Sequence, residues 1–169
     1  EGLRMLGQKI VLTSGTYDIL HVGHANYLEK ARGLGDFLIV GVDSDSKVKK
    51  RKGAHRPIVP EDERLLMLAH LRHVDGLVLK DVGVPEHHLM MMVKPDVLVI
   101  SETTDHSEES VADMRKYCGE VKLLEPQAET STTAQIRKLL IEGIEKFVAN
   151  ARKGINAVFD DLISNIRGG

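Results

Sequence analysis

Short apolar runs alternate along the chain with longer segments of helical pattern, and this alternation restricts the fold more than any other feature. The runs contain few polar residues, as expected of strands covered on both faces. We expect strands at residues 9–14, 37–42, 76–80, 96–100 and 121–124. We expect helices at residues 22–34, 61–72, 85–93, 108–117 and from 132 onward. Strands joined by helix-sized connections are parallel, so the predicted fold is α/β, with a Rossmann-like, doubly wound, five-stranded parallel sheet.

The first predicted strand leads directly into Gly15, Thr16 and Tyr17, and two histidines, His21 and His24, open the helix that follows. A strand-to-helix turn presents free backbone N–H groups and the positive end of a helix dipole, which favour an anion such as a phosphate chain. The histidines are one helical turn apart, so they share a face and can hold that chain from the side. In a doubly wound sheet, ligands bind beyond the carboxyl ends of the strands, where this turn falls.

Zinc binding is the competing chemical interpretation of the two histidines. Their His-x-x-His spacing is shorter than the usual zinc pair, and Cys118 is the only cysteine, so we expect no metal site built from protein ligands alone. A single histidine near a helix start is typically a cap or a surface residue. Two histidines around Gly23, after a strand, a glycine and a threonine, favour phosphate binding instead. Asp18 is better suited to bracing or capping this turn than to reacting.

Residues 15–24 resemble the HxGH signature of the cytidylyltransferase-like nucleotidyltransferases. The resemblance continues in the family's order through several further blocks. These blocks are residues 26–31, 34–42, 44–45, 52–53, 56–64, 71–75, 131–133 and 136–137. The nearest resemblance is to adenylyltransferase domains that act on heptose 1-phosphate, followed by glycerol-3-phosphate cytidylyltransferases. The likeness therefore covers most of the chain and is far more specific than one motif.

The resemblance implies transfer of a nucleoside monophosphate from ATP or CTP to a phosphorylated sugar or polyol, with release of pyrophosphate. AMP is favoured over CMP. The acceptor phosphate is already anionic, so catalysis depends on alignment and charge neutralisation more than on a strong base. Mg²⁺ is expected to accompany the triphosphate and to need few protein ligands.

Several alternatives remain open at this point. Residues 100–105 depart from the Gly-Gly-Asp-Tyr-like stretch that approaches the base in heptose-type relatives, so the base is undecided. Cytidylyl transfer to glycerol 3-phosphate and a nucleotide-binding sensor without turnover are the other candidates. Class I aminoacyl-tRNA synthetases share the HxGH helix, but 169 residues are too few for their tRNA-binding regions.

The resemblance also implies two groups of site residues. The catalytic group comprises His21, His24, Lys49 and Arg64. The nucleotide-binding group comprises Gly15, Thr16, Tyr17, Gly23, Lys47, Ser131, Thr132 and Thr133. The hydroxyls of residues 131–133 precede the last predicted helix, where they cap free N–H groups and, by resemblance, bind the β- and γ-phosphates.

The basic stretch at residues 47–52 lies within a polar segment, residues 43–53, that we interpret as a flexible connection with at most one helical turn. A solvated basic loop is its plainest interpretation, and a nucleic-acid patch is another. Its place after the second strand favours a clamp over phosphates, and the resemblance implies that Lys47 and Lys49 contact them. Arg64 matches the family's phosphate-binding arginine, with a surface salt bridge as the alternative.

Composition limits the class of partner. The chain has 23 Lys and Arg against 25 Asp and Glu, so no basic field argues for a nucleic-acid partner. Its longest apolar runs fall far below the roughly 20 residues of a membrane span. One free cysteine suits a reducing compartment. We therefore expect a cytoplasmic protein with neither a nucleic-acid nor a membrane partner.

Residues 141–169 are predicted to form a helical extension after a nucleotidyltransferase domain at residues 1–140. Apolar residues recur in the extension at nearly heptad spacing, which creates a stripe that a lone helix cannot bury. We expect the stripe to pack on a second copy, giving a homodimer, with the flank of the same sheet as the alternative. Gly143 and Gly154 are expected to divide the extension into two helices. By resemblance, a sugar kinase is fused to or paired with this domain in the full-length protein.

Overall fold

The computed structural model describes residues 2–85, 87–102, 106–127 and 132–167, with the backbone alone at 132–135 and 157–167. The chain divides into two compact units, residues 1–129 and 130–169. The domain boundary expected at residue 140 falls within the second of these units and stays a prediction.

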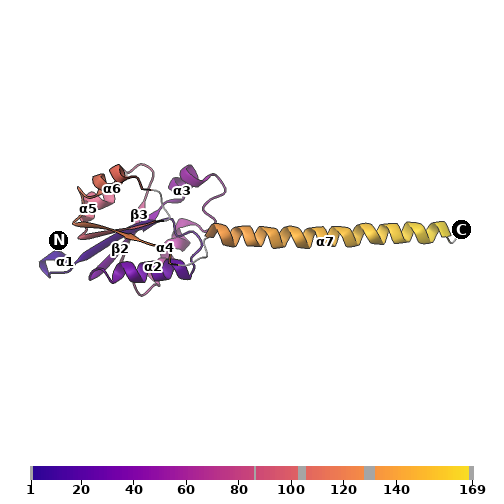
Figure 1. Ribbon diagram of the computed structural model, residues 1–169, viewed down its shortest axis with the longest axis horizontal. Helices are drawn as coiled ribbons and strands as arrows, with labels where there is room; N and C mark the ends of the chain where they lie inside the picture. Colours follow the sequence, from indigo (N-terminus) through magenta and orange to yellow (C-terminus); the bar gives the residue numbers. More distant parts are fainter. Residues whose placement is uncertain (1, 86, 103–105, 128–131, 168–169) are drawn as a thin grey trace. The chain divides into compact units, whose positions relative to one another are not determined.

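One sheet of five strands forms the centre of the first unit, and every neighbouring pair of strands is parallel. Its strands are β1 (Ile10–Gly15), β2 (Phe37–Asp43), β3 (Gly76–Lys80), β4 (Val97–Ser101) and β5 (Glu120–Leu124). The order β3-β2-β1-β4-β5 places β1 at the centre, with the chain winding outward first on one side and then on the other. Helices lie on both sides of this sheet (Figure 1). The predicted doubly wound Rossmann-like sheet is confirmed, and β1 ends at the change of direction where such sheets bind ligands.

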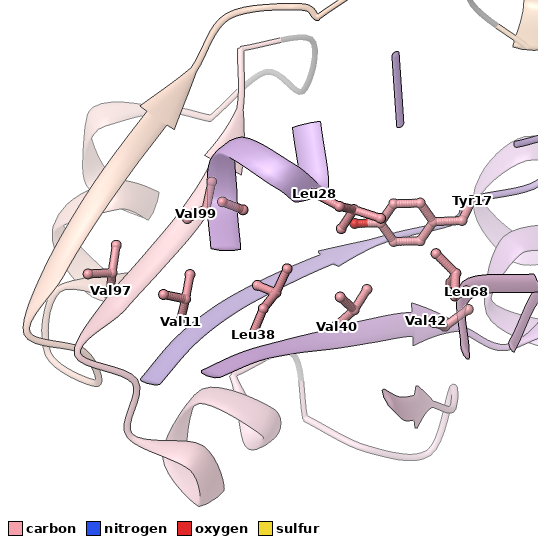
Figure 2. Close-up of a cluster of buried hydrophobic side chains, with 10 residues drawn as sticks. Val11, Tyr17, Leu28, Leu38, Val40, Val42, Leu68, Val97 and Val99 are labelled. Carbon is pink, nitrogen blue, oxygen red and sulfur yellow. The ribbon is translucent and has the colours of Figure 1, made fainter. Parts of the chain in front are cut away.

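Helices cover both faces of the sheet. The helices of the first unit are α1 (Gly2–Met5), α2 (Val22–Arg32), α3 (Asp45–Lys52), α4 (Glu61–Ala69), α5 (His88–Val93) and α6 (Glu108–Met114). Leu28 of α2 and Leu68 of α4 pack in one cluster with valines and leucines of β1, β2 and β4 (Figure 2). On the other face, Leu89 of α5 and Met114 of α6 pack with Leu12 of β1.

Strand β1 is buried along most of its length, which explains its apolar sequence. Ile10, Val11, Leu12 and Thr13 are each at most 4 % exposed, because both faces of the strand are covered. Burying a Val or Leu side chain contributes roughly 1.5–3 kcal/mol. The two clusters therefore fix the end of β1, and with it the turn that carries the histidines.

The segment expected to be a flexible connection is the helix α3, so that expectation is wrong. Ser44 is its N-cap, with the Oγ atom accepting a hydrogen bond of 3.2 Å from the amide of Lys47. Val48 is fully buried and anchors one side of the helix. The capping serine and the buried valine stabilise this helix, although charged residues dominate its sequence and favoured the interpretation as a loop.

The second unit contains one helix, α7 (Thr132–Arg167), of 36 residues. It runs without a break through Gly143 and Gly154, so the expectation of two helices is wrong. A glycine costs only about 1 kcal/mol inside a helix, too little by itself to end one. Large apolar side chains are exposed along the helix, at Leu139, Leu140, Ile141, Ile144, Phe147, Val148 and Ile155. Within the described residues, no helix combines the length and apolar character that a membrane crossing requires.

Candidate nucleotide-binding site

The turn after β1 is fixed by the backbone and ring of Tyr17. Tyr17 has a φ of +51°, in the left-handed region that non-glycine residues seldom adopt. Its ring folds back over Gly15, where a Cβ atom would lie 2.9 Å from a ring carbon, so only glycine fits. Tyr17 is 5 % exposed, and burial raises the pKa of its phenol well above the usual range. The Tyr17 ring therefore belongs to the core and holds the turn in place (Figure 2).

The structure brings His21 and His24 together, as the sequence predicted. His21 is the N-cap of α2, and its Nδ1 atom accepts a hydrogen bond of 3.2 Å from the amide of Gly23. An accepting Nδ1 places the proton of the neutral ring on Nε2, which is then a donor. The two imidazole centroids are 4.0 Å apart, and the His24 ring meets the Tyr17 ring edge-on at 5.5 Å.

Both histidines are neutral near pH 7. Burial, with smaller contributions from the nearby His21 and Lys52, lowers the pKa of His24 to about 4. Burial also lowers the pKa of His21. The Nδ1 atom of His24 is buried without a hydrogen-bond partner among the described residues. Such an unsatisfied atom costs roughly 1–3 kcal/mol and is typical of functional sites rather than of cores.

The low pKa of His24 predicts a loss of stability in acid. The unfolded chain, with an ordinary histidine pKa, binds a proton between about pH 6.5 and pH 4 that the folded chain does not. The free energy of unfolding therefore decreases as the pH is lowered through this window, by about 1–2 kcal/mol after discounting for partial exposure. Urea unfolding at about pH 7 and about pH 4.5 measures the loss. In His24→Ala the loss should be smaller by that amount, and an equal loss in both proteins would contradict the assignment.

Basic residues of α3 gather around a buried carboxylate at the end of β2. Asp43 is 2 % exposed, and Arg51 donates from Nη2 to its Oδ2 at 2.8 Å. The same Nη2 donates to Oγ1 of Thr16 at 2.7 Å. The ammonium groups of Lys47 and Lys80 lie 3.7 and 3.9 Å from the Asp43 carboxylate. Two predicted nucleotide-binding residues, Thr16 and Lys47, therefore belong to one charged cluster.

Two basic residues beside this site, Arg51 and Lys52, are missed at the level of sequence. The resemblance points to Lys49 instead, but Lys49 is exposed and makes no ion pair with the described residues. Lys52 is close enough to lower the pKa of His24, and its own pKa is lowered by burial and by Arg51. Helical periodicity could have found both residues, because Arg51 follows Lys47 and Lys52 follows the buried Val48 by four positions. Interpreting α3 as a flexible connection hides that signal.

Asp18 braces the loop before α4. Its Oδ1 atom accepts hydrogen bonds from the amides of Ile58 and Val59 at 2.8 and 2.9 Å. The Arg56 guanidinium lies 2.9 Å from Oδ2 as an ion pair, without the alignment of a hydrogen bond. Asp18 is 4 % exposed, and these contacts give it the bracing role expected for it.

Arg64 is buried rather than open to solvent. It is 1 % exposed, and each of its three nitrogens donates to a protein oxygen. Nε donates to the carbonyl of Val59 at 3.0 Å, Nη1 to that of Thr16 at 2.5 Å, and Nη2 to Asp45 Oδ1 at 2.8 Å. Arg64 therefore ties α4 to α3 and to the turn after β1. Direct phosphate binding by Arg64 stays a prediction, and it would require the buried guanidinium to become accessible to the ligand.

The predicted phosphate-binding hydroxyls after β5 are only partly within the structure. Ser131 lies outside the described residues. Thr132 and Thr133 form the start of α7, in the second unit, and only their backbone is described. Their roles stay predictions.

Known proteins resemble this chain over most of its length. A family model described as cytidylyltransferase-like matches residues 12–142. The bifunctional protein HldE of Pseudomonas paraeruginosa is 44 % identical over 146 residues, covering 85 % of this chain and 30 % of that protein. The bifunctional protein HldE of Nitratiruptor sp. is 43 % identical over 139 residues, covering 82 % of this chain and 29 % of that protein. This chain thus spans less than a third of the length of these curated relatives.

A solved structure shares the fold. The lipopolysaccharide core biosynthesis protein from Thermoplasma volcanium aligns with a TM-score of 0.62 at 29 % identity. The alignment covers 74 % of this chain and 100 % of that one. A second structure, a protein of unknown function from Archaeoglobus fulgidus, aligns with a TM-score of 0.50 at 20 % identity and supports the fold alone. That alignment covers 69 % of this chain and 96 % of that one.

Proposed function

This chain belongs to the cytidylyltransferase-like family, and from that premise we propose that it transfers a nucleoside monophosphate from a nucleoside triphosphate to a phosphorylated sugar. The observation that carries the proposal is the pair of neutral imidazoles, 4.0 Å apart, at the end of the central strand. AMP is favoured over CMP because the HldE relatives match the adenylyl-type resemblance. The Thermoplasma relative is named for lipopolysaccharide core biosynthesis, which supports a sugar phosphate over a polyol phosphate.

The site suits an in-line displacement on phosphorus. An oxygen of the acceptor phosphate forms a bond to the α-phosphorus. The bond between that phosphorus and the oxygen bridging the α- and β-phosphates breaks, so that pyrophosphate leaves with the negative charge. Neutral His21 and His24 each donate one hydrogen bond to phosphoryl oxygens as this charge develops. The cations of α3 neutralise part of the charge on the leaving group.

Mg²⁺ would accompany the triphosphate rather than occupy a site built by the protein. Among the described residues, no group of three or more His, Cys, Asp or Glu side chains is arranged to hold a metal ion. The buried Asp43 carboxylate at this edge already carries Arg51 and lysine partners. Mg²⁺ commonly keeps several waters and binds mainly through substrate phosphates, so it needs few protein ligands.

Pyrophosphate release tests the proposed reaction. The protein is incubated with Mg²⁺, with ATP or CTP, and with a panel of sugar and polyol phosphates. We expect release that requires both ATP and a sugar phosphate, with omission of the acceptor as the control. Release with CTP and glycerol 3-phosphate instead would assign the cytidylyl alternative. Nucleotide binding without release across the panel would favour the sensor and contradict transfer.

We also propose that α7 mediates a homodimer and that a sugar kinase is fused to or paired with this domain. The curated relatives are named bifunctional, and this chain spans less than a third of their length, which supports a second catalytic domain. The apolar residues of α7 remain exposed, with Phe147 at 73 % and Ile144 at 62 %. Because the helix is continuous, this surface is long enough to pair with the same surface of a second copy.

Removing residues 145–169 should convert the dimer to a monomer. The truncation deletes Phe147, Val148 and Ile155 from the exposed apolar surface, shortens α7 to its first turns and leaves the first unit intact. Light scattering coupled to size-exclusion chromatography measures the mass of both proteins. The same number of chains per particle before and after truncation would contradict the proposal.

A further inference from the structure

Arg51 occupies an unusual position among the basic residues of α3. It is anchored on one side by a buried carboxylate, since Nη2 lies 2.8 Å from Oδ2 of Asp43. Its side chain is nevertheless 53 % exposed. A guanidinium that is anchored through one nitrogen and exposed at the others has lost much of its conformational freedom before a ligand binds. Binding therefore costs less entropy.

Arg51 has further hydrogen-bond donors that its contacts with Asp43 and Thr16 do not use. Its contacts with the described residues use Nη2 alone, which donates to Asp43 and to Thr16. Nε and Nη1 make no hydrogen bond within the described part of the chain. Nε and Nη1 do not share an edge of the guanidinium, because each shares one with Nη2, so each is free to donate to a different phosphoryl oxygen.

The contact with Thr16 adds a further donor. Because Oγ1 of Thr16 accepts from Arg51 at 2.7 Å, the hydroxyl proton of Thr16 points away from the guanidinium. Thr16 directly follows Gly15 at the carboxyl end of β1, where this class of sheet binds ligands. The next residue, Tyr17, contacts the His24 ring. Arg51 is therefore connected to the histidine pair through the turn that Thr16 and Tyr17 form.

We propose that Arg51, held in place by Asp43, is a phosphate-binding residue that acts together with the Thr16 hydroxyl. This inference rests on the proposed nucleotidyltransferase function and assigns a further ligand to the same site. The phosphate belongs either to the nucleoside triphosphate or to the acceptor, since both must reach this edge of the sheet.

Binding of defined phosphates to matched variants tests the inference. Isothermal titration calorimetry measures Kd for ATP with Mg²⁺ and, separately, for a sugar 1-phosphate. Arg51→Ala should raise Kd for at least one of them by about 10- to 100-fold, because charged hydrogen bonds are lost. Arg51→Lys should remain weaker than the unmodified protein by about 3- to 10-fold, since an ammonium lacks the fixed, planar spread of donors that a guanidinium has. Lys50→Ala is the control, because it removes the same charge from an exposed neighbour.

The two titrations show whether Arg51 binds a phosphate of ATP or the phosphate of the acceptor. Weaker binding of ATP alone assigns Arg51 to the triphosphate, and weaker binding of the sugar phosphate alone assigns it to the acceptor. Unchanged binding of both ligands in Arg51→Ala, with the unmodified protein binding normally, overturns the inference and leaves the proposed function standing. Failure of the unmodified protein to bind ATP, CTP and the sugar phosphate overturns both. Equal losses in Arg51→Ala and Lys50→Ala show only general charge attraction and also overturn the inference.

Discussion

Replacing His24 by alanine is expected to lower kcat by about 100- to 1,000-fold, as loss of one preorganised donor to a phosphoryl oxygen typically does. The folded structure should survive, with the free energy of unfolding changed by no more than about 1 kcal/mol at neutral pH. The reason is that His24 is half-buried and its Nδ1 atom has no hydrogen-bond partner among the described residues. Removing the ring takes away packing and an unsatisfied polar atom together. Initial rates of pyrophosphate release and urea unfolding measure the two effects.

His21 provides the matched control for His24. Its Nδ1 atom caps α2 through the amide of Gly23, so His21→Ala should lose turnover and also about 1 kcal/mol of stability. His21→Asn should recover the stability, because asparagine is a good N-cap, without recovering full turnover. Wild-type rates in His24→Ala would contradict the mechanism. So would a loss of rate that follows stability across all three variants.

Replacing Arg64 by methionine is expected to destabilise the protein by about 3–5 kcal/mol. The substitution preserves much of the side-chain volume but leaves Asp45 and the carbonyls of Thr16 and Val59 without their donors. Arg72→Met is the control, since Arg72 is exposed and surface changes of this kind usually stay within about 0.5 kcal/mol. Urea unfolding of both variants measures the difference. If Arg64 were only a phosphate ligand, the variant would lose activity and keep the stability of the unmodified protein.

The sequence could predict the sheet and the histidine pair because each depends on local pattern. Strand β1 is apolar because both of its faces are covered, and that burial is visible as an uninterrupted run of residues. His21 and His24 meet because three positions make one helical turn. The all-parallel arrangement follows from the helix-sized connections between strands.

The surroundings of Arg64 and Arg51 could not be predicted from the sequence, because they depend on contacts between distant segments. Arg64 resembles a phosphate ligand by motif, yet its partners, Thr16 and Asp45, come from other elements, and only the fold shows that they enclose it. Arg51 escapes notice because charge dominates the sequence of α3 and conceals its helical period. Burial of Val48, which fixes that period, is a property of packing and is not visible in the basic stretch itself.

The proposed function depends on His21 and His24 holding a triphosphate at the end of β1. A crystal structure of this chain with Mg²⁺ and a non-hydrolysable ATP analogue tests it most directly. We expect the Nε2 atoms of both rings to lie within about 3.2 Å of phosphoryl oxygens. A fully occupied nucleotide bound elsewhere, with both imidazoles remote from its phosphates, would contradict it.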